Sequence, residues 1–154
     1  GVDGQLQPQT GGQGRLLLGA QLLADTMPGM ERSNILYNFD VAKQYDTVAV
    51  AEGPLDVLRA GPQCVGTFGK AVTPRQVEMI KTHWSKAFIL RDPGVDPESP
   101  QFKRMLAGFA GLPVVHLCLA GNKDPGATPR EDTWQQITAA EHAKFQNRLT
   151  PSLN

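Results

Sequence analysis

The chain has 154 residues, and its 15 basic and 15 acidic residues give a formal charge of zero at neutral pH. This length supports one domain with a substantial core, and the balanced charge excludes a global field that attracts nucleic acid or membrane, so a nucleic-acid role needs a local basic patch. Cys64 and Cys118 lack zinc-ligand spacing, and neither a signal peptide nor a membrane-spanning run is present. We therefore expect a cytoplasmic protein with no membrane partner.

The first 46 residues are irregular in composition. Residues 1–14 are rich in Gly and Gln and predict a flexible lead-in. Because the chain opens on Gly1 without an initiator Met, we expect a processed or excised piece of a longer protein. Residues 15–46 form a second segment, with a short strand expected at 15–18, a turn at 27–30 and an apolar piece at 34–39.

From Thr47 onward, apolar runs alternate with amphipathic segments. Thr73 and Thr128 each precede a Pro and begin a capping box, which marks a helix start. We expect strands at 47–51, 63–67, 86–91 and 112–119, and helices at 54–60, from 73, at 100–110 and at 129–147, before a frayed tail at 150–154. This alternation predicts an α/β domain over 47–149, with a parallel sheet of about four strands and helices on both faces.

Acidic residues follow three of the expected strands. Glu52 follows the first strand, Asp92 and Asp96 follow the third, and Asp124 follows the fourth. Because ligands bind at the carboxyl ends of parallel strands, we expect these side chains to converge. Converging carboxylates repel one another, and a hard divalent ion such as Mg²⁺ relieves that repulsion. The pattern therefore suggests a metal site and phosphate chemistry.

The ordered motifs resemble the TOPRIM domain, the catalytic fold of bacterial and phage-type primases, topoisomerases and some nucleases. Glu52-Gly53-Pro54-Leu55-Asp56-Val57-Leu58 is similar to the first motif of the family, and Asp92 stands where its Asp-x-Asp motif begins. The primase branch fits best, because residues 33–40, 65–73 and 121–125 resemble further primase elements. The resemblance covers roughly residues 15–140.

The resemblance implies the catalytic core of a primase-like nucleotidyltransferase, of phage or mobile-element type, that makes RNA primers on a DNA template. By this analogy, Mg²⁺ or Mn²⁺ is held by Asp92 with Asp124 or Asp96, and Glu52 helps to deprotonate the attacking 3′-hydroxyl. The implied partners are nucleoside triphosphates and single-stranded DNA, with a zinc-binding module and a helicase outside this chain.

Further residues are candidates for contacts or support, each with a plainer alternative. Lys70, Lys123, Arg15 and Arg32 are the candidates for contact with nucleotide, phosphate or template, and Gly53, Asp56, Gly66 and Gly69 are the candidates for support. The alternatives are a helix cap at Glu52, ordinary turn chemistry at Asp92 and at Lys123-Asp124, a solvated acid at Asp56 and backbone geometry at the glycines.

The third strand end departs from the family pattern. Gly94 stands where the second Asp of the Asp-x-Asp motif is expected, the next acid is Asp96, and Pro93 fixes the backbone between them. The lysine expected in a primase around residues 24–28 is also missing. Two alternatives therefore stay open: a TOPRIM-type nuclease, and a non-catalytic nucleic-acid- or nucleotide-binding module with a degenerate metal site.

Overall fold

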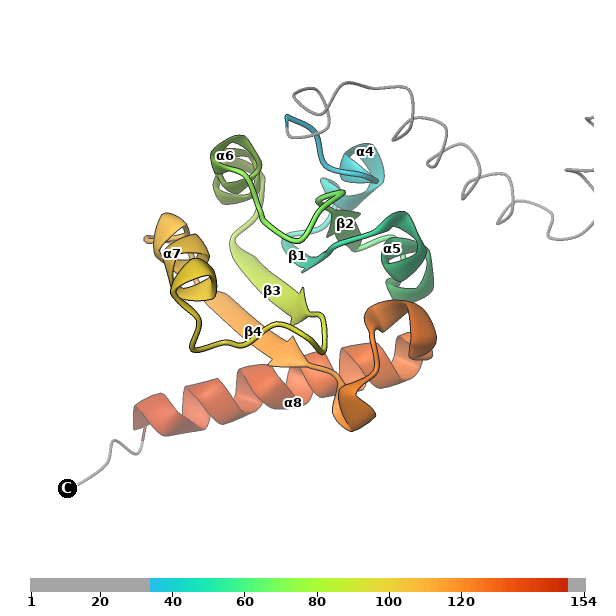
Figure 1. The fold of residues 1–154 in the computed structure, drawn as a ribbon, viewed down its shortest axis with the longest axis vertical. Helices are drawn as coiled ribbons and strands as arrows, with labels where there is room; N and C mark the ends of the chain where they lie inside the picture. The colour runs from blue at the N-terminus through green and yellow to red at the C-terminus, as the bar shows by residue number, and fades with distance from the viewer. Residues whose placement is uncertain (1–33, 150–154) are drawn as a thin grey trace, which may run out of the picture.

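The centre of the fold is a four-stranded parallel sheet (Figure 1). The computed structural model describes residues 34–149. The sheet has the order β2-β1-β3-β4, with β1 at Thr47–Ala51, β2 at Cys64–Gly66, β3 at Lys86–Arg91 and β4 at Val114–Cys118. Val50 of β1 pairs with Val65 on one side and Ile89 on the other. This register confirms the predicted parallel sheet and brings the ends of β1 and β3 side by side.

Helices cover both faces of the sheet, as predicted. They are α4 (Phe39–Ala42), α5 (Pro54–Ala60), α6 (Pro74–His83), α7 (Pro100–Gly108) and α8 (Arg130–Leu149), with short 3₁₀ turns η1 (Ala120–Asn122) and η2 (Pro125–Ala127). Figure 1 shows α6 and α7 on one face and α5 and α8 on the other. Strand β4 is shorter than the expected 112–119, and it begins only after Pro113, which has no N–H to donate to a ladder.

Two apolar cores lie on opposite faces of the sheet, and β1 contributes to both. Val48 and Val50 pack with Ile80 of α6, whereas Ala49 and Ala51 pack on the α5 and α8 side. Successive strand residues point to opposite faces. A strand buried on both faces has no polar side to show, which explains the continuous apolar run at 47–51.

Gln76 connects three segments beside the sheet. In the predicted capping box, Thr73 Oγ1 accepts from the Gln76 N–H at 3.1 Å and Gln76 Oε1 accepts from the Thr73 N–H at 2.9 Å. The same buried side chain donates through Nε2 to the carbonyls of Ile35 (2.8 Å) and Thr67 (2.9 Å). A residue expected only to start a helix therefore also holds the chain before β1 and the chain after β2.

The start of α8 differs from the expected capping box at Thr128. The Thr128 hydroxyl donates to the Asp124 carbonyl at 3.1 Å, and the helix begins at Arg130. The preceding turn η2 uses this hydroxyl, which is why the side chain serves the turn rather than the helix.

Some predictions concern residues outside the described range of 34–149. These are the lead-in at 1–14, the strand at 15–18, the turn at 27–30, the tail at 150–154, and the candidate contacts Arg15 and Arg32. Within the described range, no helix combines the length and the hydropathy that crossing a bilayer requires.

Candidate functional site

Glu52 and Asp92 form a carboxyl pair at the ends of neighbouring strands. Glu52 directly follows β1 and Asp92 directly follows β3, and the two carboxyl groups lie within reach of a bond between them. Two carboxyl groups form such a bond only when they share a proton, so the contact raises the pKa of Glu52 to about 7. Partial burial and the charge of Asp92 act in the same direction, whereas the positive charge of Lys70 opposes them.

The pair opens into a small pocket above the carboxyl edge of the sheet. Glu52, Lys70 and Asp92 line it together with Thr67 and Gly69, and apolar side chains from α7 also line it. Its volume of about 50 Å³ holds a few water molecules or a partly hydrated ion. A whole nucleotide is too large for this space.

The loop between β2 and α6 holds Lys70 near the pair. The Phe68 N–H donates to the Glu52 carbonyl at 2.8 Å, and Thr67 Oγ1 donates to the Gly69 carbonyl at 2.7 Å. Phe68 adopts a left-handed backbone with φ of 66°, which is uncommon for a bulky residue and marks a tightly constrained turn. The backbone of Glu52 is thereby tied to the loop that carries the nearest lysine.

Gly66 has a structural role at the end of β2. Its N–H and carbonyl both pair with Tyr37, and an added Cβ would lie 3.1 Å from Val57 Cγ2. The close approach of α5 and the chain before β1 leaves no room for a side chain. By contrast, an added Cβ at Gly69 would meet no atom within 4 Å.

Asp56 joins two loops that carry acids. Its Oδ2 accepts from the Gly53 N–H at 3.2 Å and its Oδ1 accepts from the Gly126 N–H at 2.8 Å. Burial is the main cause that raises the pKa of Asp56, and the charges of Asp92 and Asp124 add to it, whereas the two backbone bonds lower it. The carboxyl group of Asp56 therefore interacts electrostatically with both Asp92 and Asp124.

Asp124 occupies the far side of this acidic group. Its Oδ1 accepts from the Ala127 N–H at 2.9 Å and caps the short turn η2. A Cβ placed on Gly126 would lie 2.9 Å from Asp56 Oδ1 and 3.4 Å from Asp124 Oδ1, so both carboxylates approach this glycine. Asp124 and Asp56 thus both lie beside Gly126, whereas Glu52 lies beside Asp92. Its neighbour Lys123 is exposed.

Asp96 turns to its own backbone. The Val95 N–H donates to the Asp92 carbonyl at 3.0 Å, which closes a turn around Pro93 and Gly94. The exposed Asp96 then accepts from the Glu98 N–H at 2.9 Å through Oδ1. Gly94 has no left-handed φ, and a Cβ added there would meet no atom within 4 Å. The position where the TOPRIM pattern has its second Asp therefore has room for a side chain.

The acids fit a metal only in part. Across residues 34–149, no group of three or more His, Cys, Asp or Glu side chains is arranged to hold an ion. Mg²⁺ commonly binds through one or two carboxylates and takes its other oxygens from water and phosphate. The pair of Glu52 and Asp92, beside a pocket of water size, fits a site in which two carboxylates hold the ion and water or phosphate supplies the other oxygens.

Two residues at the site had no role in the sequence interpretation. Arg91 lines the pocket, donates through Nε to His116 Nδ1 at 3.1 Å and lies over the Phe102 ring. The signal for it was a basic residue directly before Asp92. The sequence around Gly126 gives no comparable indication of its role, because its partner Asp56 lies 70 positions earlier in the chain.

Comparison with solved structures gives the class of fold. The chain is similar to the Aquifex aeolicus primase, in a structure of its zinc-binding and RNA polymerase domains, with a TM-score of 0.61 and 23% identity over 77% of this chain and 34% of that one. It is also similar to the DnaG primase catalytic domain bound to single-stranded DNA (TM-score 0.59, 18% identity, 80% of this chain and 44% of that one). A third is the E. coli primase catalytic core (0.59, 18%, 80% and 45%).

The chain therefore has the fold of DnaG-type primase catalytic cores, which contain the TOPRIM domain. It spans about a third of the length of the first of these structures and under half of the others. No family model matches the sequence, and no curated protein sequence matches it either.

The Asp56 bonds give a test of how the site is held. Asp56→Asn replaces one acceptor oxygen by an amide that cannot accept from a backbone N–H, and we expect it to lower the free energy of unfolding by about 1–3 kcal/mol. Urea unfolding measures the change. Asp40→Asn is the control, because its ion pair with Lys43 is exposed and is expected to contribute under about 1 kcal/mol. Equal effects would contradict the role of Asp56.

The raised pKa of Glu52 predicts how stability depends on pH. Between the ordinary value of 4.5 and about 7, the folded protein keeps a proton that the unfolded chain has lost, so stability falls as pH rises through this window. Glu52→Gln removes the titration. Because Glu52 is partly exposed, we expect wild type to lose only about 1 kcal/mol relative to the variant. Thermal unfolding across this window measures the difference, and parallel curves would contradict the shared proton.

Proposed function

We propose that this chain is the catalytic core of a primase-like nucleotidyltransferase that uses a divalent metal to extend RNA primers on a DNA template. The placement of Glu52 and Asp92 at the carboxyl ends of the paired strands β1 and β3, on one shared pocket, is the observation that carries the proposal. The similarity in fold to primase catalytic cores supports it. One of those cores is bound to single-stranded DNA, and we extend that ligand to this chain as the template.

Asp92 is the proposed principal ligand of Mg²⁺ or Mn²⁺, and Glu52 the proposed proton acceptor. When bound, the ion neutralises charge on the transferring phosphoryl group. Glu52 takes the proton of the attacking 3′-hydroxyl, that oxygen forms a bond to the α-phosphorus, and pyrophosphate leaves. Glu52 is placed for this task by its position at the end of β1, on the pocket that Asp92 also lines.

Lys70 is the proposed contact for the nucleotide phosphates. It is exposed at the mouth of the pocket, and its charge acts on Glu52. A lysine ammonium attracts phosphate oxygens as a point charge. Lys123 remains a weaker candidate of the same kind, because it lies on the loop of Asp124. Asp56 serves as support through its two backbone bonds.

Titration with Mn²⁺ tests the metal ligands. We expect Asp92→Asn to abolish binding, and Asp96→Asn to weaken it only slightly, because Asp96 bonds to its own loop. Gly94→Asp should bind Mn²⁺ several-fold more tightly, because a second carboxylate fits the open space at this position. Calorimetry measures all three against wild type. If Asp96→Asn abolishes binding, Asp96 is a ligand after all; if wild type and Gly94→Asp both fail to bind, a metal-free binding module is the better interpretation.

Primer synthesis tests the role of Glu52. With ribonucleotides, Mg²⁺ and a single-stranded template, Glu52→Gln should lower the rate of primer synthesis by about 10²–10⁴-fold, because the variant cannot accept a proton. Its affinity for Mn²⁺ should change much less than that of Asp92→Asn. Glu78→Gln, on the exposed face of α6, is the matched control and should keep the wild-type rate. Cleavage of labelled DNA without nucleotides would instead support a nuclease.

A further inference from the structure

A second hollow lies at the opposite edge of the sheet from the carboxyl pair. It is a groove of about 320 Å³ between the C-terminal half of α8 and the first residues of β3 and β4. A neighbouring hollow of about 330 Å³ shares Pro113, Val114, Lys144 and Arg148 with it and continues past His116 to the end of α7. Together they form an edge groove, which runs along the amino ends of the strands.

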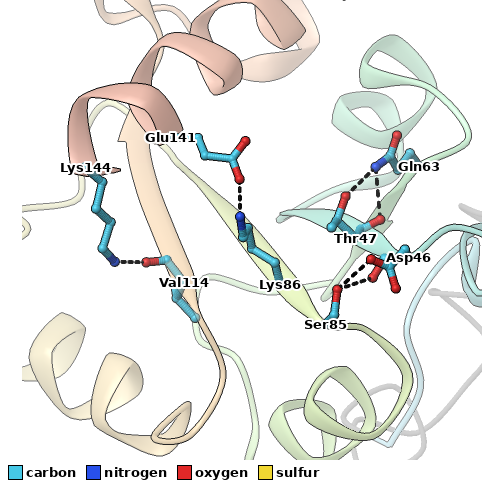
Figure 2. A network of polar contacts seen from close by, with 8 residues as sticks. All are labelled: Asp46, Thr47, Gln63, Ser85, Lys86, Val114, Glu141 and Lys144. Carbon is cyan, nitrogen blue, oxygen red and sulfur yellow. Dashed lines mark hydrogen bonds and ion pairs between the residues drawn. The ribbon is translucent and has the colours of Figure 1, made fainter. Parts of the chain in front are cut away.

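Basic side chains outnumber acidic ones in the edge groove. Lys86, His142, Lys144 and Arg148 line the first hollow, and Glu141 is the one acid among its lining residues. Figure 2 shows that Glu141 forms an ion pair with Lys86. Within residues 34–149, no carboxylate pairs with Lys144 or Arg148. This local excess of positive charge occurs in a chain whose total charge is zero.

Lys144 is held over the sheet edge with its charge available. Its ammonium group donates to the Val114 carbonyl at the start of β4 (Figure 2). An ammonium group has three donors, so two remain for a ligand. Burial lowers the pKa of Lys144, and the charges of Arg148 and Lys86 lower it further. Positive charges that repel one another in this way are stabilised by an anion placed between them.

Phe145 adds an exposed aromatic ring to the same groove. The ring lines the first hollow, and 55% of the residue is exposed to solvent. Exposed aromatic rings beside cations are the usual platform for single-stranded nucleic acid, since bases stack on the ring while phosphates meet the cations. An acidic peptide would use the cations but has no base to place on the ring.

We infer that the edge groove binds single-stranded nucleic acid, with Lys144 and Arg148 on successive phosphates and a base stacked on Phe145. This site is separate from the carboxyl pair, because one lies at the amino ends of the strands and the other at the carboxyl ends. Binding here does not require the proposed catalytic activity. Contacts to phosphate carry no sequence information, so the groove is expected to bind single-stranded nucleic acids of different base sequence.

Binding of a fluorescent oligothymidylate to the full chain tests the inference. At low salt, Arg148→Glu and Phe145→Ala should each weaken binding by about tenfold, by losing a phosphate contact and a stacked base respectively. Arg148→Lys should bind nearly as wild type, because it keeps the charge. Arg104→Glu is the matched control for charge reversal, on the exposed face of α7. Asp92→Asn should bind as wild type, which separates this site from the proposed catalytic one.

Three results would overturn the inference. Wild type could fail to bind the oligonucleotide at low salt, or Arg148→Glu could bind no more weakly than Arg104→Glu. A poly-glutamate peptide could compete as well as an unlabelled oligonucleotide, which would assign the edge groove to an acidic protein. Thermal unfolding shows whether each variant is folded, and a decrease of about one unit in the salt slope for Arg148→Glu would mark the lost phosphate contact.

Discussion

Two carboxylates at the ends of neighbouring parallel strands cannot both be ionised without compensation. Two like charges about 4 Å apart repel by roughly 4 kcal/mol at an effective dielectric constant of about 20. A proton shared by Glu52 and Asp92 would meet this constraint and accounts for the raised pKa of Glu52, while Lys70 acts as a partial counter-charge. The proton is lost as pH rises through about 7. A divalent cation would take its place above that pH, so the strain that the pair imposes on the fold is also what would make it bind a metal.

The fold holds this pair in place through backbone bonds rather than through ion pairs. The register of β1 and β3 fixes the positions of the two acids, and the hydrogen bond from the Phe68 N–H to the Glu52 carbonyl fixes the loop beside them. Asp56 then joins the start of α5 to the turn that carries Asp124. These bonds remain in salt, unlike exposed ion pairs, so the site keeps its geometry when its own charges change.

Local patterns in the sequence predict the parts of the structure that depend on neighbouring residues. The strands at 47–51 and 86–91 have the predicted bounds, because a continuous apolar run identifies a strand buried on both faces. The helix start at Thr73 follows from its capping box. The bond between Asp56 and Gly126 could not be predicted, because its partners are 70 positions apart and ordinary in their local sequence. The same holds for Lys144 and Val114 at the edge groove, which only the packing of α8 brings together.

The edge groove also changes what the balanced composition means. A total charge of zero argues against a chain that attracts nucleic acid over its whole surface. Here, however, the acids Glu52, Asp56 and Asp92 gather at the carboxyl ends of the strands, and Lys144 and Arg148 lie at the amino ends. These opposite charges cancel in the total charge of the chain, but each edge of the sheet keeps its own local potential. A nucleic acid that is attracted to the basic edge is repelled from the acidic edge unless a cation is bound there. The two proposals together therefore predict that metal has little effect on nucleic-acid binding in the edge groove. They also predict that metal has a large effect on the entry of phosphate at the carboxyl pair.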